Sequence, residues 1–569
     1  MSQKKSKRWV IADRVPESVD RELQAFQPTF RQLLFNRGIT TEEAAQQFLY
    51  GKGEVHDPFL LKGMDQAVPL ILDAISQGKK IVVYGDYDAD GVTATALLVE
   101  GIQALGGRAT GYIPNRFDEG YGLNSAAIRQ LAQEGADLVV SVDCGIRSVE
   151  EAAVARELGL PLIITDHHHP LTVVPDAAAV ICPKQEGDAY PEKNLSGVGL
   201  AYKLFCGLCM RSPACAVDVE EWLDLVAIGT VADMVPLVGE NRILVRRGLN
   251  KLRIGKRIGV VALANVAGTD LITMTASTIG FQLGPRINAA GRIESPMAAY
   301  DLLTSKEILE SGLLAQRVDD RNRERQQQTR DMQLQAESML NVDDETYILT
   351  VVDEAFNSGI IGLVASRLTE ENYLPTIVGS RADGEIRASC RSIVELHITK
   401  TLDECADLLV RHGGHASAAG FTVVEDRWPE LLERLNAIAR RELAHKDLRP
   451  VIRIDADVAL KDLKSELLDW IELLEPTGME NPLPVFCTRN VELRNVKVIG
   501  SEKNHLKFLA AQQNLVFDCV AFKMAELKSD LPKLVDIAYT FEKNNWQGRT
   551  SLQLKVIDIK PAASLQSGI

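Results

Sequence analysis

The chain has 569 residues, which is too long for one hydrophobic core, so we expect about three or four domains. With 46% hydrophobic and 25% charged residues, the composition is that of an ordinary globular protein and excludes large-scale disorder. A formal net charge of −15 argues against unspecific coating of nucleic acid, because such binding needs a basic surface. The acidic excess also fits a protein that gathers carboxylates to hold cations.

The compartment is indicated by what the sequence lacks. No run of eighteen apolar residues occurs, and no apolar region follows the basic residues 1–8, so we expect neither secretion nor a membrane span. Nine cysteines without framework spacing fit a reducing compartment, and we expect the protein to be cytoplasmic. Cys206 and Cys209 form one CxxC pair, but without a second pair or spaced histidines a zinc site is disfavoured.

The first part of the chain predicts a parallel β-sheet. Short apolar runs alternate with helical patterns, which is typical of a βαβ series and of a sheet buried on both faces. In such sheets ligands bind at the carboxyl ends of the strands. The expected strands are residues 80–84, 109–113, 137–142, 161–165 and 179–181.

Three acids follow the first of these strands at alternate positions. Asp86, Asp88 and Asp90 are closed off by Gly91 and the start of a helix. A lone carboxylate in such a place is usually a helix cap, but three within five residues indicate cation ligands. An EF-hand loop is excluded because the residues after Gly91 do not supply its further acids.

The same arrangement recurs at two later strands. Asp143 ends one apolar run, and residues 166–169 (DHHH) end the next. Because the carboxyl ends of parallel strands meet at one edge, these groups should crowd together, and crowded acids and imidazoles need a cation to hold them. Carboxylate and imidazole ligands without thiolate suit Mn²⁺ or Mg²⁺, and two ions about 3.5–4 Å apart would support phosphate hydrolysis.

Later segments predict a helix, a second α/β lobe and a barrel. Residues 305–340 are rich in Leu, Gln, Arg and Glu and should form one long helix linking two lobes. Strands at 347–352 and 376–378 with a helix around 362–368 should form the second lobe. Strand-like runs from about residue 450 onward suggest a small closed barrel of the OB type.

The chain resembles the DHH phosphoesterase superfamily in four motifs whose order and intervals match. These are residues 86–91 (DYDADG), 142–145 (VDCG), 166–168 (DHH) and 231–236 (VADMVP). Residues 411–420 (RHGGHASAAG) resemble the GGH motif of the associated DHHA1 domain, and residues 283–292 (LGPRINAAGR) are similar to a stretch characteristic of RecJ exonucleases.

The resemblance implies an α/β protein of four parts. A parallel-sheet DHH catalytic domain with an N-terminal extension would cover residues 1–304, and a long connecting helix residues 305–340. A smaller α/β DHHA1 domain would cover residues 341–448, and an OB-like nucleic-acid-binding β-barrel residues 449–562.

The resemblance also implies the roles of individual residues. It assigns catalysis to Asp143, which would bridge two ions, to His168 and to His415. Without the family pattern, Asp233 would be interpreted as a helix cap, and only that pattern makes it a ligand. The implied metal ligands for two ions of Mn²⁺ or Mg²⁺ are Asp86, Asp88, Asp90, Asp143, His167 and Asp233.

Two positions depart from the family pattern. Tyr84 and Asn357 stand where relatives commonly have histidine, so one metal site and one substrate contact differ from the usual arrangement. His169 is an additional histidine for which a structural role is expected.

Substrate contacts are expected in both lobes. Gly413 and Gly414 should open a helix whose amides face a phosphate with His415 beside them; the alternative is a tight turn. Arg387, Ser389 and Arg391 share one face of an extended segment and should hold a terminal phosphate. Four further positions resemble phosphate contacts, although each alone could be a surface salt bridge: Asn115, Arg116, Arg286 and Asn288.

Basic and aromatic residues suggest a path for a nucleic-acid strand. The basic residues between Arg242 and Arg257 are expected to form a positive track, the alternative being a solvated face. In the barrel, aromatic residues should stack bases while lysines follow phosphates, unless two of the aromatics belong to the core. The aromatics are Phe508, Phe522 and Trp546, and the lysines are Lys507, Lys523 and Lys555.

The function implied by the resemblance is a 5′ to 3′ exonuclease of single-stranded DNA that releases 5′-mononucleotides in repair and recombination. Two alternatives remain: a DHH phosphodiesterase of short RNA or cyclic dinucleotides, which should lack the barrel, and a non-catalytic DNA-binding scaffold, which should have lost its acids. The expected partners are single-stranded DNA, a single-strand-binding protein and a helicase, with no membrane partner and a monomeric state.

The distribution of the motifs also predicts how removal of the barrel affects cleavage and DNA binding. All residues assigned to chemistry lie before residue 420. Truncation after about residue 448 should therefore leave cleavage of very short oligonucleotides nearly unchanged, while long strands are bound more weakly.

Overall fold

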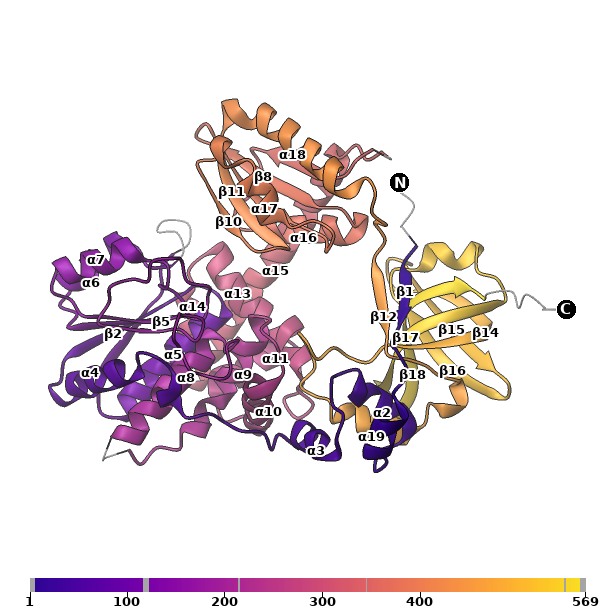
Figure 1. The fold of residues 1–569 in the computed structure, drawn as a ribbon, viewed down its shortest axis with the longest axis horizontal. Coiled ribbons are helices and arrows are strands. Elements are labelled where there is room, and N and C mark those ends of the chain that lie inside the picture. Colours follow the sequence, from indigo (N-terminus) through magenta and orange to yellow (C-terminus); the bar gives the residue numbers. More distant parts are fainter. Residues whose placement is uncertain (1–5, 116–121, 213–214, 344, 547–548, 563–569) are drawn as a thin grey trace. The chain divides into compact units, whose positions relative to one another are not determined.

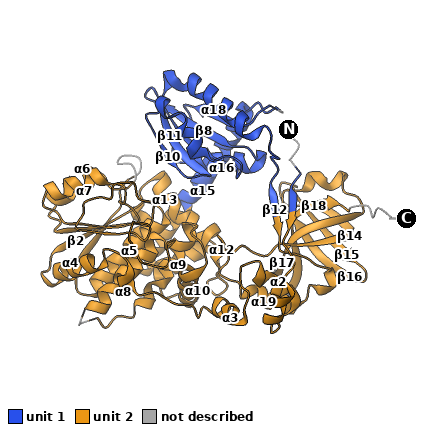
Figure 2. Ribbon diagram, in the orientation of Figure 1, with its two compact units in different colours: residues 1–9, 320–452 blue, residues 10–319, 453–569 orange. Residues whose placement is uncertain are grey.

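The computed structural model describes residues 6–115, 122–212, 215–343, 345–546 and 549–562. The chain divides into two units, one of residues 1–9 and 320–452 and one of residues 10–319 and 453–569 (Figure 2). Among the described residues, no helix combines the length and the apolarity needed to cross a membrane.

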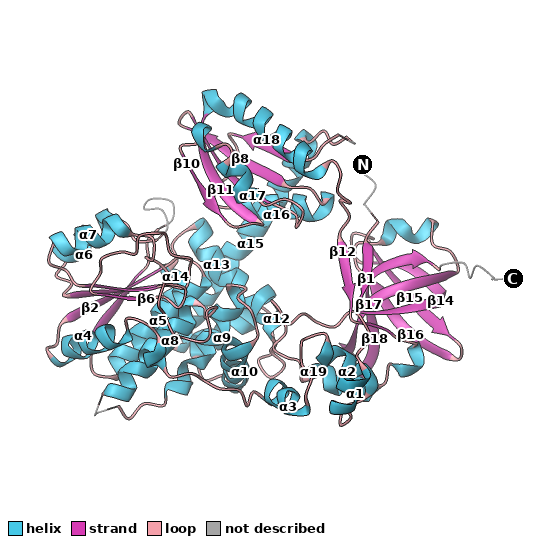
Figure 3. Cartoon of the chain, in the orientation of Figure 1, coloured by secondary structure: helices cyan, strands magenta, loops and turns pink. Residues whose placement is uncertain are grey.

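A parallel five-stranded sheet forms the centre of the larger unit, as the sequence predicts (Figures 1 and 3). Its strand order is β3-β2-β4-β5-β6. The chain runs from β2 to β3 on one side and then returns to β4 on the other, so β2 and β4 flank a topological switch point, where ligands bind in such sheets. The strands are β2 (Lys80–Gly85), β3 (Arg108–Tyr112), β4 (Leu138–Val142), β5 (Leu162–Thr165) and β6 (Ala179–Ile181).

Helices cover both faces of this sheet because its strands are apolar on both sides. Ile81 and Val83 face one core, and Val82 and Tyr84 face the other. The first core includes α4 (Met64–Ser76), α5 (Ala89–Ala104) and α8 (Gly197–Arg211), and the second includes α6 (Ser125–Gln133) and α7 (Val149–Glu157).

A helical layer extends the first core. It contains α9 (Leu223–Ala232), α10 (Gly239–Ile254), α11 (Ile258–Val266), α13 (Gly284–Ile293) and α14 (Met297–Thr304). The short α12 (Ala276–Thr278) continues through a π-helical turn, Ile279–Leu283, directly into α13. The long helix expected over residues 305–340 is α15 (Ile308–Met339).

The smaller unit has a five-stranded sheet with the order β10-β11-β9-β8-β7, in which only β7 and β8 run parallel. Its strands are β7 (Leu349–Asp353), β8 (Thr376–Ala382), β9 (Glu385–Arg391), β10 (Arg411–Gly414) and β11 (Ala418–Val424), and its main helices are α16 (Ile361–Asn372), α17 (Ile398–Asp403) and α18 (Trp428–Leu443).

The prediction that a helix begins at Gly413 and Gly414 is wrong. These glycines end β10, and the chain turns back into β11, with Gly414 paired opposite Ala419. Gly414 has a φ of 147°, and a Cβ there would lie 2.4 Å from the carbonyl oxygen of Ala418. Glycine is therefore required by the close approach inside a hairpin and not by a helix start.

The C-terminal strands form the expected barrel. β14 (Phe486–Ile499), β15 (His505–Gln512), β16 (Leu515–Ala521), β18 (Arg549–Pro561) and β17 (Leu534–Trp546) follow one another in the sheet, and pairing of β14 with β17 closes it. The short β12 (Val451–Ile454) and β13 (Ala456–Asp457) precede them, and α19 (Ser465–Glu472) lies between β13 and β14.

The N-terminal helices belong to the core of this barrel, which sequence inspection did not suggest. Leu23, which follows α1 (Glu17–Glu22), shares one apolar cluster with the barrel strands. Phe30 and Leu34 of α2 (Pro28–Phe35) and residues of α3 (Glu42–Tyr50) belong to the same cluster. The rings of Phe26 and Phe30 each lie 5.3 Å from that of Trp470 on α19. The two ends of the chain therefore build one core.

Candidate metal centre

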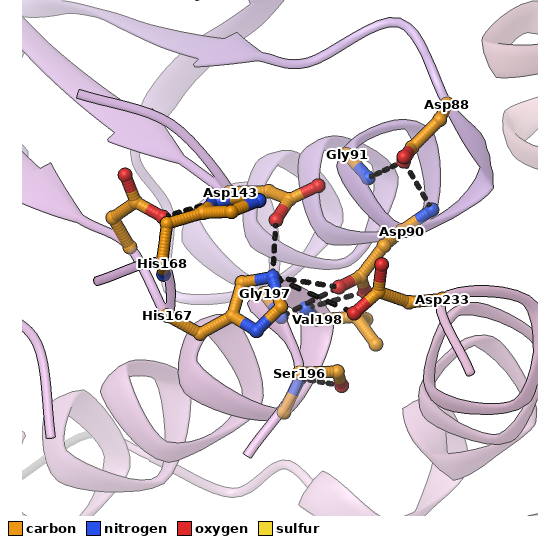
Figure 4. Close-up of polar contacts among 12 residues, drawn as sticks. Asp88, Asp90, Gly91, Asp143, His167, His168, Ser196, Gly197, Val198 and Asp233 are labelled. Carbon is orange, nitrogen blue, oxygen red and sulfur yellow. Dashed lines mark hydrogen bonds and ion pairs between the residues drawn. The ribbon is translucent and has the colours of Figure 1, made fainter. Parts of the chain in front are cut away.

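The first acidic motif is a tight connection between β2 and α5. Asp88 is the N-cap of α5, where its Oδ1 accepts hydrogen bonds from the backbone N–H of Asp90 at 2.9 Å and of Gly91 at 3.1 Å (Figure 4). Asn288 Oδ1 on α13 accepts from Ala89 N–H at 2.7 Å. The acids thus sit on a loop that is held from both sides.

Asp90 is held by the start of another helix. Its carboxylate is buried and accepts from the N–H groups of Gly197 at 2.6 Å and Val198 at 2.8 Å, the first residues of α8. The side chain of Ser196 caps this helix, and the sequence gives no sign that the amides of the helix start bind Asp90. A Cβ on Gly197 would lie 2.5 Å from Asp143 Cβ, which explains the glycine.

Asp143 follows β4 in a left-handed backbone conformation, with a φ of 62°. This conformation is uncommon for residues other than glycine and marks a position fixed by its surroundings. The side chain is buried, and its Oδ1 lies 3.1 Å from Nε2 of His167.

His167 lies at the middle of the cluster (Figure 4). Besides its approach to Asp143, its Nε2 lies 3.5 Å from Asp233 Oδ2 and 4.0 Å from Asp90 Oδ2. Asp233 is the C-cap residue of α9, and this backbone position is compatible with a ligand role for its carboxylate.

Asp166 supports the cluster from behind. Its Oδ1 lies 2.7 Å from Nδ1 of His168, and its Oδ2 accepts from Ile146 N–H at 2.9 Å. Burial raises the pKa of Asp166, but the hydrogen bond and charge of His168 lower it below its ordinary value. For His168, burial lowers the pKa, but the same contact raises it above its usual range. A carboxylate in this position fixes the orientation of the imidazole ring.

The structure brings all the expected ligands together in three overlapping groups of potential ligand atoms, each within 4.8 Å. Asp143 and His167 each belong to two of the groups, so they can connect neighbouring ion positions. The groups are Asp143 with His167 and His168, Asp90 with His167 and Asp233, and Asp86 with Asp88 and Asp143.

Unsatisfied buried atoms fit a bound cation. Oδ1 of Asp86, Oδ1 of Asp143 and both ring nitrogens of His167 are buried and make no hydrogen bond within the described part of the chain. Such atoms are costly to bury unless a ligand satisfies them. The donor set of carboxylates and imidazoles matches Mn²⁺ or Mg²⁺.

The electrostatics lead to the same conclusion. Burial, followed by the charge of Asp88, raises the pKa of both Asp86 and Asp90 to about 7. Burial and the charge of Asp90 raise the pKa of Asp233 to about 9 and that of Asp143 well above its usual range. Carboxylates that disfavour one another's ionisation become charged together when divalent cations neutralise them.

Tyr84 does not face this cluster. Its ring is buried in the core on the other face of the sheet, its hydroxyl donates to the carbonyl of Gly122 at 3.0 Å, and it accepts from Asn124 Nδ2 at 3.1 Å. The side chain is a core residue, so the departure from the family pattern leaves the ligand groups complete.

Two of the predicted substrate-contacting residues near the sheet make hydrogen bonds within the protein. Arg286 on α13 donates from Nε to Asp319 Oδ1 at 2.8 Å, and Asn288 holds Ala89 as described above. Asn115 follows β3 and is partly exposed, whereas Arg116 lies outside the described residues. Contact of these residues with substrate stays a prediction.

The predicted positive track is wrong at its two ends. Arg242 is buried and donates to backbone carbonyls of residues 473–476. Arg257 is paired with Glu100 and Asp224. Their concentration in the sequence suggests a basic surface because the sequence does not show which distant acids and carbonyls fold against them.

In the smaller unit, the alternation predicted for β9 is confirmed. Arg387, Ser389 and Arg391 point away from the core, and Arg391 donates to Ser389 Oγ and Ser366 Oγ, both at 3.1 Å. His415 is exposed at the hairpin turn, where its N–H donates to the Ala418 carbonyl at 2.7 Å.

The other departure from the family pattern, Asn357, lies in the same unit. Its Oδ1 accepts from Gly359 N–H at 2.8 Å and so shapes the loop before α16.

The barrel aromatics differ in exposure. Phe508 is 1% exposed and belongs to the core, so its expected stacking role is wrong. Phe522 is 48% exposed, with Nζ of Lys555 5.8 Å from its ring centroid, which is a suitable platform for a base. The side chain of Trp546 lies outside the described residues.

Comparison with known proteins identifies the family. The DHH family N-terminal domain matches residues 80–230, the DHHA1 domain residues 344–441 and the RecJ OB domain residues 454–558. The single-stranded-DNA-specific exonuclease RecJ of Dickeya dadantii is 35% identical over 93% of this chain and 96% of its own. This chain belongs to the RecJ family. The RecJ of Bacillus subtilis is 40% identical over 93% of this chain and 68% of its own.

A solved member of the family has the same fold. The crystal structure of RecJ from Thermus thermophilus in complex with Mn²⁺ superposes with a TM-score of 0.85 at 30% identity, covering 99% of this chain and 81% of that one. A second structure of that protein, in complex with Mg²⁺, gives a TM-score of 0.79 at 29% identity, covering 99% of this chain and 80% of that one.

Proposed function

We propose that this protein is a two-metal-ion phosphodiesterase that degrades single-stranded DNA from the 5′ end and releases 5′-mononucleotides in repair and recombination. The observation that carries the proposal is the pair of shared residues, Asp143 and His167, which join neighbouring ligand groups into one centre. Family membership supports single-stranded DNA as the substrate, and the direction of digestion is inferred from the same resemblance.

The protein supplies a fixed set of donors for Mn²⁺ or Mg²⁺. Bound divalent ions activate water and neutralise phosphoryl oxygens during in-line displacement. The N–H groups of Gly197 and Val198 hold Asp90, and Asp166 holds the ring of His168. Because these contacts exist before substrate binds, little reorganisation is needed at the moment of reaction.

In the smaller unit, we assign substrate contacts to one strand and one hairpin. Arg387, Ser389 and Arg391 on β9 are suited to hold a terminal phosphate, because their side chains lie on one face. Gly413 and Gly414 allow close approach of a strand, and His415 supplies a further donor or acid–base group.

The two alternatives are less well supported. A phosphodiesterase of short RNA or cyclic dinucleotides does not require the C-terminal barrel, whose match to the RecJ OB domain covers residues 454–558. A non-catalytic scaffold would have no need for a cluster of buried acids that lack internal partners, because such a cluster destabilises the fold.

The domain limits and partners complete the proposal. We assign residues 1–304 to the catalytic domain with an N-terminal extension, whose helices α1 to α3 pack in the core of the barrel. Residues 305–340 form the connecting helix, residues 341–448 the DHHA1 domain and residues 449–562 the barrel. A cytoplasmic monomer that works with a single-strand-binding protein and a helicase fits a repair exonuclease.

Digestion of end-labelled single strands tests the function. With Mn²⁺ present, a strand labelled at its 5′ end should give labelled mononucleotide at once, whereas a 3′ label should move into progressively shorter fragments. Chelation of the metal should stop both. Immediate release of mononucleotide from the 3′ label would overturn the direction, and cleavage of cyclic dinucleotides alone would overturn the substrate.

A further inference from the structure

Residues 473–481, which connect α19 to the barrel strand β14, form a closed loop that we call the anchor segment. Asn481 is fully buried within it, and its Nδ2 donates to the carbonyls of Leu474 at 2.8 Å and Pro476 at 2.7 Å. Gly478 N–H donates to the Asn481 carbonyl at 2.8 Å. The segment is therefore internally fixed, unlike an ordinary flexible linker.

Arg242 on helix α10 of the catalytic part forms hydrogen bonds with the anchor segment. Nη1 of Arg242 donates to the carbonyls of Leu474 at 2.7 Å and Pro476 at 3.0 Å, and Nη2 donates to those of Leu473 and Glu475, both at 3.1 Å. Burial is the main reason that the pKa of Arg242 falls to about 9. Only the planar fork of an arginine can satisfy four carbonyls in this way.

A second contact reaches the loop that carries Asp233. Leu237, four residues after Asp233, donates from its N–H to the carbonyl of Met479 at 2.9 Å. Gly478 packs so closely that a Cβ there would lie 2.8 Å from Cδ1 of Leu237. The anchor segment therefore limits movement of the connection between α9 and α10, in which Asp233 stands.

A third contact reaches the opposite side of the metal centre. Oε1 of Glu475 accepts from Ala276 N–H at 2.5 Å, at the start of α12. That helix runs through the π-helical turn into α13, where Asn288 holds Ala89 between Asp88 and Asp90. A Cβ on Gly291 of the same helix would lie 2.7 Å from the carbonyl oxygen of Tyr87, so α13 packs directly on the acidic loop.

We propose that the anchor segment positions the metal centre, because it holds the Asp233 loop on one side and the helices behind the Asp86–Asp90 loop on the other. None of its residues belongs to the ligand groups found among the described residues, so Glu475 and Gly478 are positioning residues. Buried carboxylates that repel one another separate unless their backbones are braced, and ligand placement must hold within about 0.5 Å for tight binding. The proposal builds on the proposed function only for its activity readout.

Glu475→Ala tests the contact between the anchor segment and α12. Mn²⁺ binding to the full chain, measured by calorimetry without DNA, should weaken roughly fivefold to tenfold. Glu475→Gln keeps an acceptor for Ala276 N–H and should recover most of the affinity. Glu472→Ala is the matched control, because Glu472 lies three residues earlier and pairs with Lys543 of the barrel; it should bind Mn²⁺ like the parent protein.

Gly478→Ala independently tests the contact between the anchor segment and the connection that carries Asp233, because the added methyl group must displace Leu237. Gly312→Ala on α15 is its control, since a Cβ there meets nothing within 4 Å. Mn²⁺ affinity should fall in Gly478→Ala and stay unchanged in Gly312→Ala, and turnover of a short oligonucleotide at saturating Mn²⁺ should remain close to that of the parent.

The outcomes separate the positioning role from the function. Parent-like Mn²⁺ affinity in both Glu475→Ala and Gly478→Ala overturns the proposal, and so does an equal loss in the Glu472→Ala control. If the parent protein binds Mn²⁺ but cleaves no single-stranded DNA while both variants bind Mn²⁺ more weakly, the proposed function fails and the positioning role stands.

Discussion

Two clusters of buried charge in the same unit are built on opposite principles. Around Arg257, each carboxylate has a partner: Glu100 accepts from Arg257 at 3.0 Å and from Trp222 at 2.8 Å, and Asp224 accepts from Arg257 at 2.7 Å. In the metal centre, acids face acids and His167, whose pKa burial lowers to about 3, and Asp143 Oδ1 makes no hydrogen bond within the described chain. In the first cluster the charges are satisfied within the fold. In the second, buried atoms without hydrogen bonds among the described residues are available to a bound cation.

The pKa shifts express the same contrast. Burial lowers the pKa of Arg257, but the charges of Asp224 and Glu100 raise it above its ordinary value, so the charged form is favoured. In the metal centre, burial and repulsion raise the pKa of Asp143, so the charged form is disfavoured until cations arrive. A buried cluster that destabilises itself therefore marks a functional site more clearly than burial or charge alone.

Removing a carboxylate from the metal centre should have the largest effect on activity. Asp143→Ala should abolish hydrolysis with Mn²⁺ or Mg²⁺ while binding of single-stranded DNA survives, because Asp143 joins two ligand groups. Full activity of this variant would contradict the metal assignment.

His415 lies outside both clusters and tests whether the chemistry needs more than the metal centre. His415→Ala should reduce turnover by about two to four orders of magnitude, as expected for loss of a positioned acid–base group or donor. Calorimetric Mn²⁺ affinity should stay unchanged. A collapse of that affinity would mean that His415 is a metal ligand.

Breaking the satisfied cluster should affect stability instead. Arg257→Met leaves Glu100 and Asp224 without their partly buried cation, which should lower the free energy of unfolding by about 3 kcal/mol, the low end of the loss on breaking a buried ion pair. Denaturant unfolding would measure this, with Mn²⁺ affinity of the folded fraction as the comparison. An unchanged unfolding midpoint would show that the network contributes nothing to stability.

The smallest effect is a dependence of metal-free stability on pH. The pKa of Asp86 and Asp90 rises from 3.8 to about 7 on folding, so between these values the folded state binds protons that the unfolded state has lost. Without metal, the melting temperature should therefore fall as the pH rises from about 4 to 7. Saturating Mn²⁺ should flatten this slope. A metal-free slope of the opposite sign would mean that the pKa of these acids falls on folding.

The ligands could be predicted because parallel topology leaves little freedom at strand ends. Once the βαβ pattern places β2, β4 and β5 side by side, the residues that follow them, such as Asp86, Asp143 and His167, must meet at one edge. The groups that hold these ligands were missed. The amides of Gly197 and Val198 carry no side-chain signal, and Arg242 looked like any exposed helical arginine.

Turn geometry and long-range packing account for the remaining differences. Two adjacent glycines fit a helix start as well as a hairpin, and only the approach of Ala418 to Gly414 decides between them. The expected effect of truncation after residue 448 depends on motif positions alone. Because Arg242 is satisfied by residues 473–476 and the N-terminal helices pack in the barrel, the structure predicts that this truncation also harms the catalytic part.

The shared core of the N-terminal helices and the barrel has a consequence for biosynthesis. Asn36 bonds to Asp455 across 419 residues of sequence. At a translation rate of about 5–20 residues per second, the apolar faces of α2 and α3 wait roughly 20 to 80 s on the ribosome before their partner strands are made. Helices α2 and α3 therefore stay exposed on the nascent chain for longer than segments whose packing partners lie nearby in the sequence.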